Sequence, residues 1–223
     1  MEKENTTTIK GEILLGIIFA LELYALPTQF YLLLEGGQFT FFSAAVRFFS
    51  FFTITTNSIV FICTAILLFG GKSAMNAFFQ KCTTITAITV YILIVGIVFN
   101  LLLRSILDLK GHHRIVSEIF HTVVPTLFFF YWLYFVSPEK ISFKVILFWM
   151  FYPILYMLYT VIHGFLSNFY PYPFIDVTKL GLETALVNGV CFNCFCGFVC
   201  YFDFDFENQN QKNLNYLHLS PYF

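Results

Sequence analysis

The segment that decides the fold is residues 48–69, which reads FFSFFTITTNSIVFICTAILLF and carries no charged side chain. It is long enough for a helix that crosses a bilayer, which needs about 20 mostly apolar residues. Near its start lie Thr53, Thr55, Thr56 and Asn57, where a bilayer makes an unpaired polar atom costly. The segment therefore predicts a transmembrane helix with a polar entrance.

The composition extends this prediction to the whole chain. Of its 223 residues, 58% are hydrophobic and 11% are charged, whereas soluble domains carry roughly a quarter charged residues. The net charge of -1 leaves no basic surface for nucleic acid. The chain is therefore predicted to be an integral membrane protein whose partners are membrane lipids and not nucleic acid.

Six apolar runs reach the length of a membrane span, and none alternates as the strands of a membrane barrel do. The first run is also too long for a signal-peptide core, so we expect it to be retained. We predict an all-α fold, with six transmembrane helices in one bundle that forms a single domain over residues 1–223. The predicted spans are residues 13–34, 48–69, 83–103, 119–136, 145–166 and 180–202, between a polar N-terminus (1–10) and a polar tail (203–223).

The loops carry a small charge bias. Seven lysines lie on the side of both termini, against five lysines and arginines on the other side. Because cytoplasmic loops are enriched in Lys and Arg, this bias predicts cytoplasmic termini for a multi-pass protein, in the cytoplasmic membrane if the host is bacterial.

The polar residues of the predicted spans fall mostly in one leaflet. Ionisable side chains in a membrane are costly, so their clustering favours a shared pocket or a water-filled cavity. The alternative is that helix ends near lipid headgroups tolerate polar residues anyway. The residues concerned are Gln29, Thr53, Thr55, Thr56, Asn57, Asn100, Arg104, Glu118, His121, Thr122, His163, Asp176 and Glu183.

Two residue types in this set suggest chemistry. A threonine hydroxyl can act as a nucleophile when a base activates it, and His121 could be that base. The alternatives are that the threonines bond back to backbone carbonyls and that His121 makes an interhelical hydrogen bond or relays protons. Glu118, three residues before His121, could orient the imidazole or lie among the headgroups.

Other reactive residues carry less information. Glu22 lies in the middle of the first predicted span, where it should pair with another group, be protonated or belong to a proton or ion pathway. We expect it several turns away from the polar cluster and assign it to no site. The cysteines of the sixth span are expected to be small apolar membrane residues, and we predict no metal and no cofactor; they are Cys191, Cys194, Cys196 and Cys200.

A resemblance to a known family adds to these predictions. The segment YPYPFIDV at residues 170–177, followed by Leu180, Gly181 and Asn188, resembles the signature of the bacterial six-span Pr-six-Pr proteins, which belong to the wider androgen-induced-gene/FAR-17a-like group. Supporting matches run through Gln29-Phe30-Tyr31-Leu32, Phe51-Phe52-Thr53-Ile54 with Asn57, Phe99-Asn100, His121 with Pro125, Trp132, and Trp149 with Tyr152-Pro153 and Tyr156. Two positions depart from the bacterial pattern: Tyr131 stands where an acidic residue is frequent, and His163 where an arginine is frequent.

The resemblance implies a function in lipid metabolism. Animal members of the wider group are described as threonine hydrolases of fatty-acid esters of hydroxy fatty acids, and their Thr and His match Thr53 and His121. This implies an intramembrane lipid-ester hydrolase with Thr53 as nucleophile and His121 as base, while Thr55 and Thr56 remain alternative nucleophiles. Asn57 or Asn100 is expected to stabilise the oxyanion, and Gln29 and Asp176 are further candidates for the pocket.

A non-enzymatic membrane protein is the alternative: a small-molecule transporter, a sensor or an assembly factor. In that interpretation Thr53 only binds a ligand. The residues that would then line a polar path are Glu22, Arg104, Asp176 and Glu183.

Overall fold

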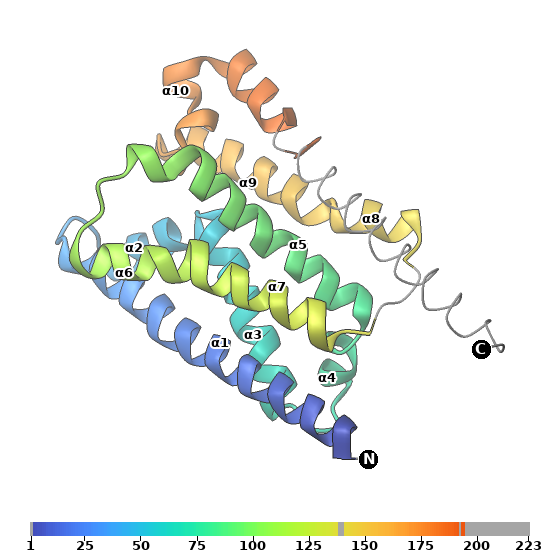
Figure 1. The fold of residues 1–223 in the computed structure, drawn as a ribbon. Helices are drawn as coiled ribbons and strands as arrows, with labels where there is room; N and C mark the ends of the chain where they lie inside the picture. Colours follow the sequence, from blue (N-terminus) through green and yellow to red (C-terminus); the bar gives the residue numbers. More distant parts are fainter. Residues whose placement is uncertain (1, 138–140, 192, 195–223) are drawn as a thin grey trace. The chain divides into compact units, whose positions relative to one another are not determined.

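A computed structural model describes residues 2–137, 141–191 and 193–194, and every regular element among them is a helix (Figure 1). Five helical segments are long and apolar enough to cross a membrane, so the predicted all-α, multi-pass membrane class is confirmed for the described residues. These segments are Ile9–Glu35, Phe52–Phe69, Cys82–Ile106, Gly111–Phe135 and Phe143–Ser167.

The sixth predicted span, residues 180–202, is not confirmed. Its described part contains a shorter apolar helix, Leu182–Cys191, and residues 192 and 195–202 lie outside the described residues. The predicted polar tail lies outside them as well. The chain divides into two compact units, Met1–Ser137 and Pro138–Phe223.

Four long helical segments form the first unit. In it α1 packs against α3 and α7, and α5 packs against the same two helices, so that a four-helix arrangement encloses the core (Figure 1). The elements are α1 (Glu2–Glu35), α2 (Phe41–Phe49), α3 (Phe52–Phe69), α4 (Ala74–Phe79), α5 (Cys82–Val98), η1 (Phe99–Leu103), η2 (Arg104–Ile106), α6 (Gly111–Glu118), η3 (Ile119–Val123) and α7 (Val124–Phe135).

The second span begins later than the sequence predicts. The run from residue 48 is interrupted because Ser50 ends α2 and Phe51 adopts an extended backbone (φ -88°, ψ 130°). The Ser50 hydroxyl donates to the Val46 carbonyl at 2.7 Å, a local bond that competes with regular helix continuation. The helix α3 therefore starts at Phe52, and Thr53 lies in its first turn.

Two π-helical turns change the third and fourth spans. The third span contains η1 and continues beyond its predicted end through η2, while the fourth begins at Gly111 instead of residue 119 and contains η3. His121 therefore lies inside a long helical segment and not at its start. Single π-turns occur frequently at functional sites because they displace the regular i→i−4 bonding pattern.

The core of the first unit is mostly apolar, and so is its outer surface. Ile18, Val60, Ile92 and Phe128 have no exposed side-chain area. Large apolar side chains such as Phe42, at 79% exposure, lie on the outside, as expected of helices that contact lipid acyl chains.

The second unit contains the segment that carries the family resemblance. Its elements are α8 (Phe143–Trp149), α9 (Phe151–Ser167), η4 (Pro173–Ile175) and α10 (Val177–Leu180), followed by the Leu182–Cys191 helix. The Tyr170 ring lies directly against Gly164 of α9, where any Cβ would collide with it. The amide of Asn188 donates to the carbonyl of Phe174 at 2.8 Å. Residues 170–177 thus contact α9 before them and the Leu182–Cys191 helix after them.

Candidate functional site

Thr53 and His121, 68 residues apart in the chain, meet in the first unit. The Oγ1 atom of Thr53 lies 3.2 Å from Nε2 of His121. Thr53 comes from the first turn of α3 and His121 from η3. This distance is within the range in which a base can take a hydroxyl proton.

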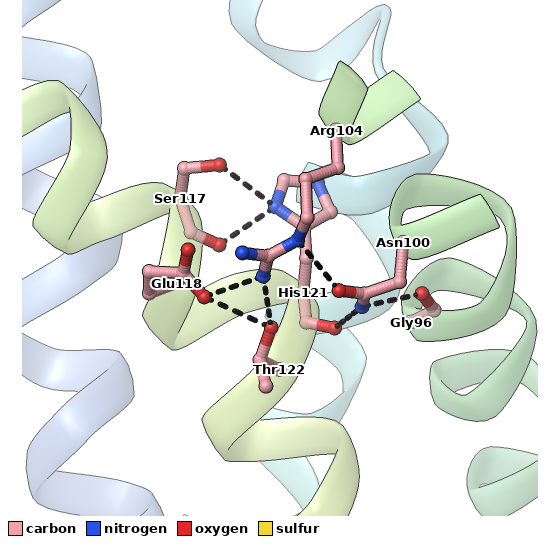
Figure 2. Close-up of polar contacts among 7 residues, drawn as sticks. All are labelled: Gly96, Asn100, Arg104, Ser117, Glu118, His121 and Thr122. Atoms are coloured by element: carbon pink, nitrogen blue, oxygen red, sulfur yellow. Dashed lines mark hydrogen bonds and ion pairs between the residues drawn. The ribbon is translucent and has the colours of Figure 1, made fainter. Parts of the chain in front are cut away.

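The second ring nitrogen of His121 determines which way that hydrogen bond runs. Nδ1 lies 2.8 Å from the backbone carbonyl oxygen of Ser117, and a carbonyl can only accept (Figure 2). Nδ1 therefore carries the hydrogen in the neutral imidazole, and Nε2 presents its lone pair to Thr53. This is the tautomer that a general base requires.

Ring packing holds the imidazole as well. The ring of Phe99 in η1 stacks on the His121 ring, with centroids 3.8 Å apart and an angle of 16° between the planes. The Ser117 hydroxyl lies 3.2 Å from Nδ1. The ring is thus fixed on one face by an aromatic side chain and at one edge by Ser117.

A polar network surrounds the backbone of His121 (Figure 2). The amide nitrogen of Asn100 donates to the carbonyls of Gly96, at 2.8 Å, and of His121, at 3.0 Å. The Nε atom of Arg104 donates to Oδ1 of Asn100 at 2.8 Å. Both amide hydrogens of Asn100 are therefore engaged: one bonds within its own helical segment, and the other joins η1 to η3.

Glu118 takes part in this network and does not contact the imidazole. Its carboxylate accepts from Arg104 Nη2 at 2.7 Å and from the hydroxyl of Thr122 at 3.1 Å, and Arg104 also donates to that hydroxyl at 3.0 Å. The group that orients His121 is the Ser117 carbonyl. Sequence reasoning missed Ser117, and the only available signal was its position one helical turn before the histidine.

The remaining polar residues of the α3 entrance have separate roles. Asn57 is fully buried, and its amide nitrogen donates to the carbonyl of Thr53 at 2.8 Å. Thr55 directs its hydroxyl back to the Phe52 carbonyl at 3.1 Å, as membrane-helix threonines often do. The Thr53 hydroxyl, by contrast, reaches His121 on another helical segment.

Two further candidates lie away from these contacts. Gln29 is half-buried on α1. Asp176 belongs to the second unit, where it caps α10 by accepting from the backbone nitrogen of Thr178 at 3.1 Å and pairs with Lys179 at 3.0 Å. The Thr178 hydroxyl and the Lys179 ammonium keep the pKa of the Asp176 carboxyl below its usual range. Asp176 thus has local partners for its carboxylate.

An open pocket lies beside the network, between α5 with η1 and η3 with α7. Its volume is about 320 Å³, and most of its lining is apolar. Its residues are Leu93, Gly96, Ile97, Asn100, Leu101, His121, Thr122, Pro125 and Thr126. Such a surface suits an acyl chain next to a polar group.

Metal ligands do not converge within the described part of the chain: no three His, Cys, Asp or Glu side chains there form a group that could hold an ion. Cys63 and Cys82 are buried, and Cys191 and Cys194 are exposed. Cys196 and Cys200 lie outside the described residues.

Comparison with protein-family models, with curated proteins and with solved structures finds no match to this chain.

Proposed function

We propose that this multi-pass helical membrane protein hydrolyses lipid esters, with Thr53 as nucleophile and His121 as general base. One observation carries the proposal: the Thr53 hydroxyl lies 3.2 Å from Nε2 of His121, while Nδ1 faces the Ser117 carbonyl. A hydroxyl is a weak nucleophile until a positioned base takes its proton, and this arrangement supplies that base.

The reaction proceeds in two halves. First, His121 takes the proton of Thr53 while Oγ1 attacks the ester carbonyl, and the tetrahedral intermediate expels the alcohol, which receives that proton from Nε2. The acyl group is then bound to Thr53 as an ester. Water, deprotonated by His121, attacks this acyl-enzyme, and the fatty acid leaves as Oγ1 regains its proton.

The surroundings of the pair fit a lipid substrate. Both residues belong to helices that are long and apolar enough to cross a membrane, and the neighbouring pocket is mostly apolar. The amide nitrogen of Asn57 makes one hydrogen bond, to the Thr53 carbonyl, so one amide hydrogen remains to stabilise an oxyanion, whereas both hydrogens of Asn100 are in use. The assignment to the androgen-induced-gene/FAR-17a-like group is part of the same proposal.

The test is ester hydrolysis by the purified full-length protein in detergent, with fatty-acid esters of hydroxy fatty acids as substrates. Thr53→Ala should abolish turnover, and His121→Ala should lower kcat/KM by about 10²–10⁴-fold, the usual contribution of a general base. Thr53→Ser should retain activity because it keeps the hydroxyl.

Thr55→Val is the matched control, since its hydroxyl bonds to its own helix. A fluorophosphonate probe should label Thr53 in the wild type and not in His121→Ala. Equal turnover of wild type, Thr53→Ala and His121→Ala would contradict the hydrolase and favour the non-enzymatic alternatives, a transporter, sensor or assembly factor.

A further inference from the structure

Glu22 is buried in the first unit, and its carboxyl group makes no hydrogen bond to any residue that the structure describes. Its side chain has no exposed area, and neither carboxyl oxygen has a partner. Ile18 and Ala25, on the same face of α1, are also completely buried. Glu22 therefore faces the interior of the helix bundle and not lipid or solvent.

Two contacts locate Glu22 along the bundle axis. Phe19 of α1 stacks on Phe61 of α3, with ring centroids 5.1 Å apart, and Gly11 of α1 lies against the Phe135 ring of α7. Both neighbouring helices run antiparallel to α1 (Figure 1). In antiparallel helices, the three residues from Phe19 forward to Glu22 correspond to three residues back from Phe61, which places Glu22 level with the segment of α3 next to Asn57. In the same way, the eleven residues from Gly11 to Glu22 correspond to eleven residues back from Phe135, which places Glu22 level with Val124 of α7.

His121 is three residues before Val124, which is on the order of 5 Å along a helix axis. The sequence-based expectation that Glu22 lies several turns from the polar cluster is thus replaced by a separation of about one turn. Glu22 belongs to the layer directly beneath the Thr53–His121 pair.

Asn57 offers the complementary group in that layer. It is fully buried, and its Oδ1 has no hydrogen-bond partner. The orientation of its amide is determined by the bond from its nitrogen to the Thr53 carbonyl, because reversing the amide would place two acceptors against each other. Oδ1 therefore remains an acceptor that needs a donor.

Within the described residues, no charged side chain bonds to the carboxyl group of Glu22. The titratable and charged side chains on the described elements that pack against α1 include the following: Arg47 of α2, Cys63 of α3, His112, His113, Arg114 and Glu118 of α6, His121 of η3, and Tyr131 and Tyr134 of α7. None of them forms a hydrogen bond or ion pair with Glu22. An isolated buried carboxylate is strongly unfavourable because it loses its hydration, whereas a protonated carboxyl is neutral and has a hydrogen to donate.

We infer that Glu22 and Asn57 form a proton-binding site in the bundle, in which the carboxylic acid of Glu22 donates to Oδ1 of Asn57. A carboxylate and an amide oxygen both accept and cannot bond to each other, so one proton on Glu22 satisfies both groups. The Asn57 carboxamide then joins Glu22 at one end to the Thr53 carbonyl at the other. That link makes Glu22 a positioning residue for Thr53, a consequence that rests on the proposed function, whereas the proton site does not.

Infrared difference spectroscopy of the full-length protein tests the site without any substrate. Glu22→Gln should remove the C=O stretch of one protonated carboxylic acid, and Asn57→Leu should shift that band. Glu12→Gln, at an exposed position of the same helix, is the matched control and should leave it unchanged. Loss of carboxylate bands alone in Glu22→Gln would overturn the inference, as would a band that Asn57→Leu leaves in place.

Thermal unfolding provides a second test, because Glu22→Met should change Tm in opposite directions if Glu22 donates to Asn57 and if its carboxyl has no partner. Glu22→Gln should unfold near the wild-type temperature because its amide can still donate to Asn57. Glu22→Met should lower Tm by about 2–8 °C, since Oδ1 loses its donor. If Glu22 were a partnerless carboxyl, Glu22→Met would raise Tm, and the inference would fail.

A cation in place of the proton would give another result. Tm would then rise with sodium or potassium concentration in the wild type and not in Glu22→Gln, which would overturn the proton site. The hydrolase can fail while these tests succeed, because neither measurement depends on ester turnover.

Discussion

The two ends of the first unit use their polar side chains differently. At the end that contains η1 and η3, hydrogen bonds cross between segments: Thr53 reaches His121, Asn100 reaches the His121 carbonyl, and Arg104 reaches Glu118. Toward the other end, hydroxyls mostly bond to their own helix. Thr64 donates to Phe61 at 3.0 Å and Thr89 to Ile85 at 2.9 Å, while Trp132 donating to Thr86 at 2.9 Å crosses between helices.

This difference indicates which polar side chains can position reactive groups and which only satisfy their own helix. A hydroxyl that bonds to its own helix is satisfied before the helices assemble, so it adds little to their mutual placement. A bond between helices forms only in the assembled bundle and fixes the relative positions of the groups it joins. The cross-linked end is therefore where a reactive pair can be held in register.

The largest effect that this comparison predicts is at Asn100. Asn100→Leu removes the donor that joins the carbonyls of Gly96 and His121, so it should destabilise the fold by about 1–3 kcal/mol. Displacement of His121 should lower ester turnover by about 10–100-fold, because small misplacements of catalytic groups are costly. Thermal unfolding and kcat/KM measure the two effects.

A second variant, Asn100→Asp, separates the bond to Arg104 from the bonds that the Asn100 amide donates. It keeps an acceptor for Arg104 but loses both donors, so it should behave like Asn100→Leu. Recovery of wild-type turnover in Asn100→Asp would show that the bond to Arg104, and not the link to the His121 carbonyl, matters.

A smaller effect is expected at Gly96. A Cβ there would lie 3.1 Å from the carbonyl oxygen of His121 and 3.2 Å from Cβ of Pro125, so Gly96→Ala must push η3 away by a few tenths of an ångström. We expect a loss of about 1 kcal/mol in unfolding free energy and a lower kcat. Gly16→Ala is the control, since nothing lies within 4 Å of its Cβ position; equal turnover in both variants would contradict the close contact at Gly96.

The smallest effects should come from the end where hydroxyls bond to their own helix. Thr64→Val and Thr89→Val each remove a bond within one helix and leave the backbone bonding intact. Tm should change by about 2 °C or less, with turnover unchanged. A drop as large as that of Asn100→Leu would show that these hydroxyls also hold helices together.

The helices themselves could be predicted from particular runs of residues. The uncharged run through Thr53 and the runs around Ile92 and Phe128 predict spans because a bilayer requires about 20 apolar residues whatever their neighbours are. The sequence could not predict the break at Ser50 and Phe51 or the π-turns of η1 and η3. Those depend on which side chains meet between helices, and no local pattern records that.

The site shows the same division. His121 could be selected from the sequence because a histidine is uncommon inside a membrane span, whereas the family resemblance singled out Thr53 among three threonines. The roles of Ser117 and Asn100 come from contacts with a neighbouring segment or turn, which composition and spacing leave open. Glu22 was recognisable as a buried acid, but its level in the bundle required the contacts of Phe19 and Gly11.

Composition and run length were enough to predict apolar membrane-spanning helices with polar residues concentrated toward one end, because the free energy of burial in a bilayer depends on these two properties. Packing between helices brings the Thr53 hydroxyl to Nε2 of His121 and places Glu22 about one turn from that pair, while the local helix geometry directs Nδ1 of His121 to the Ser117 carbonyl. Hydrogen bonds depend on distances of a few tenths of an ångström between residues far apart in the chain, and those distances exist only once the helices have packed.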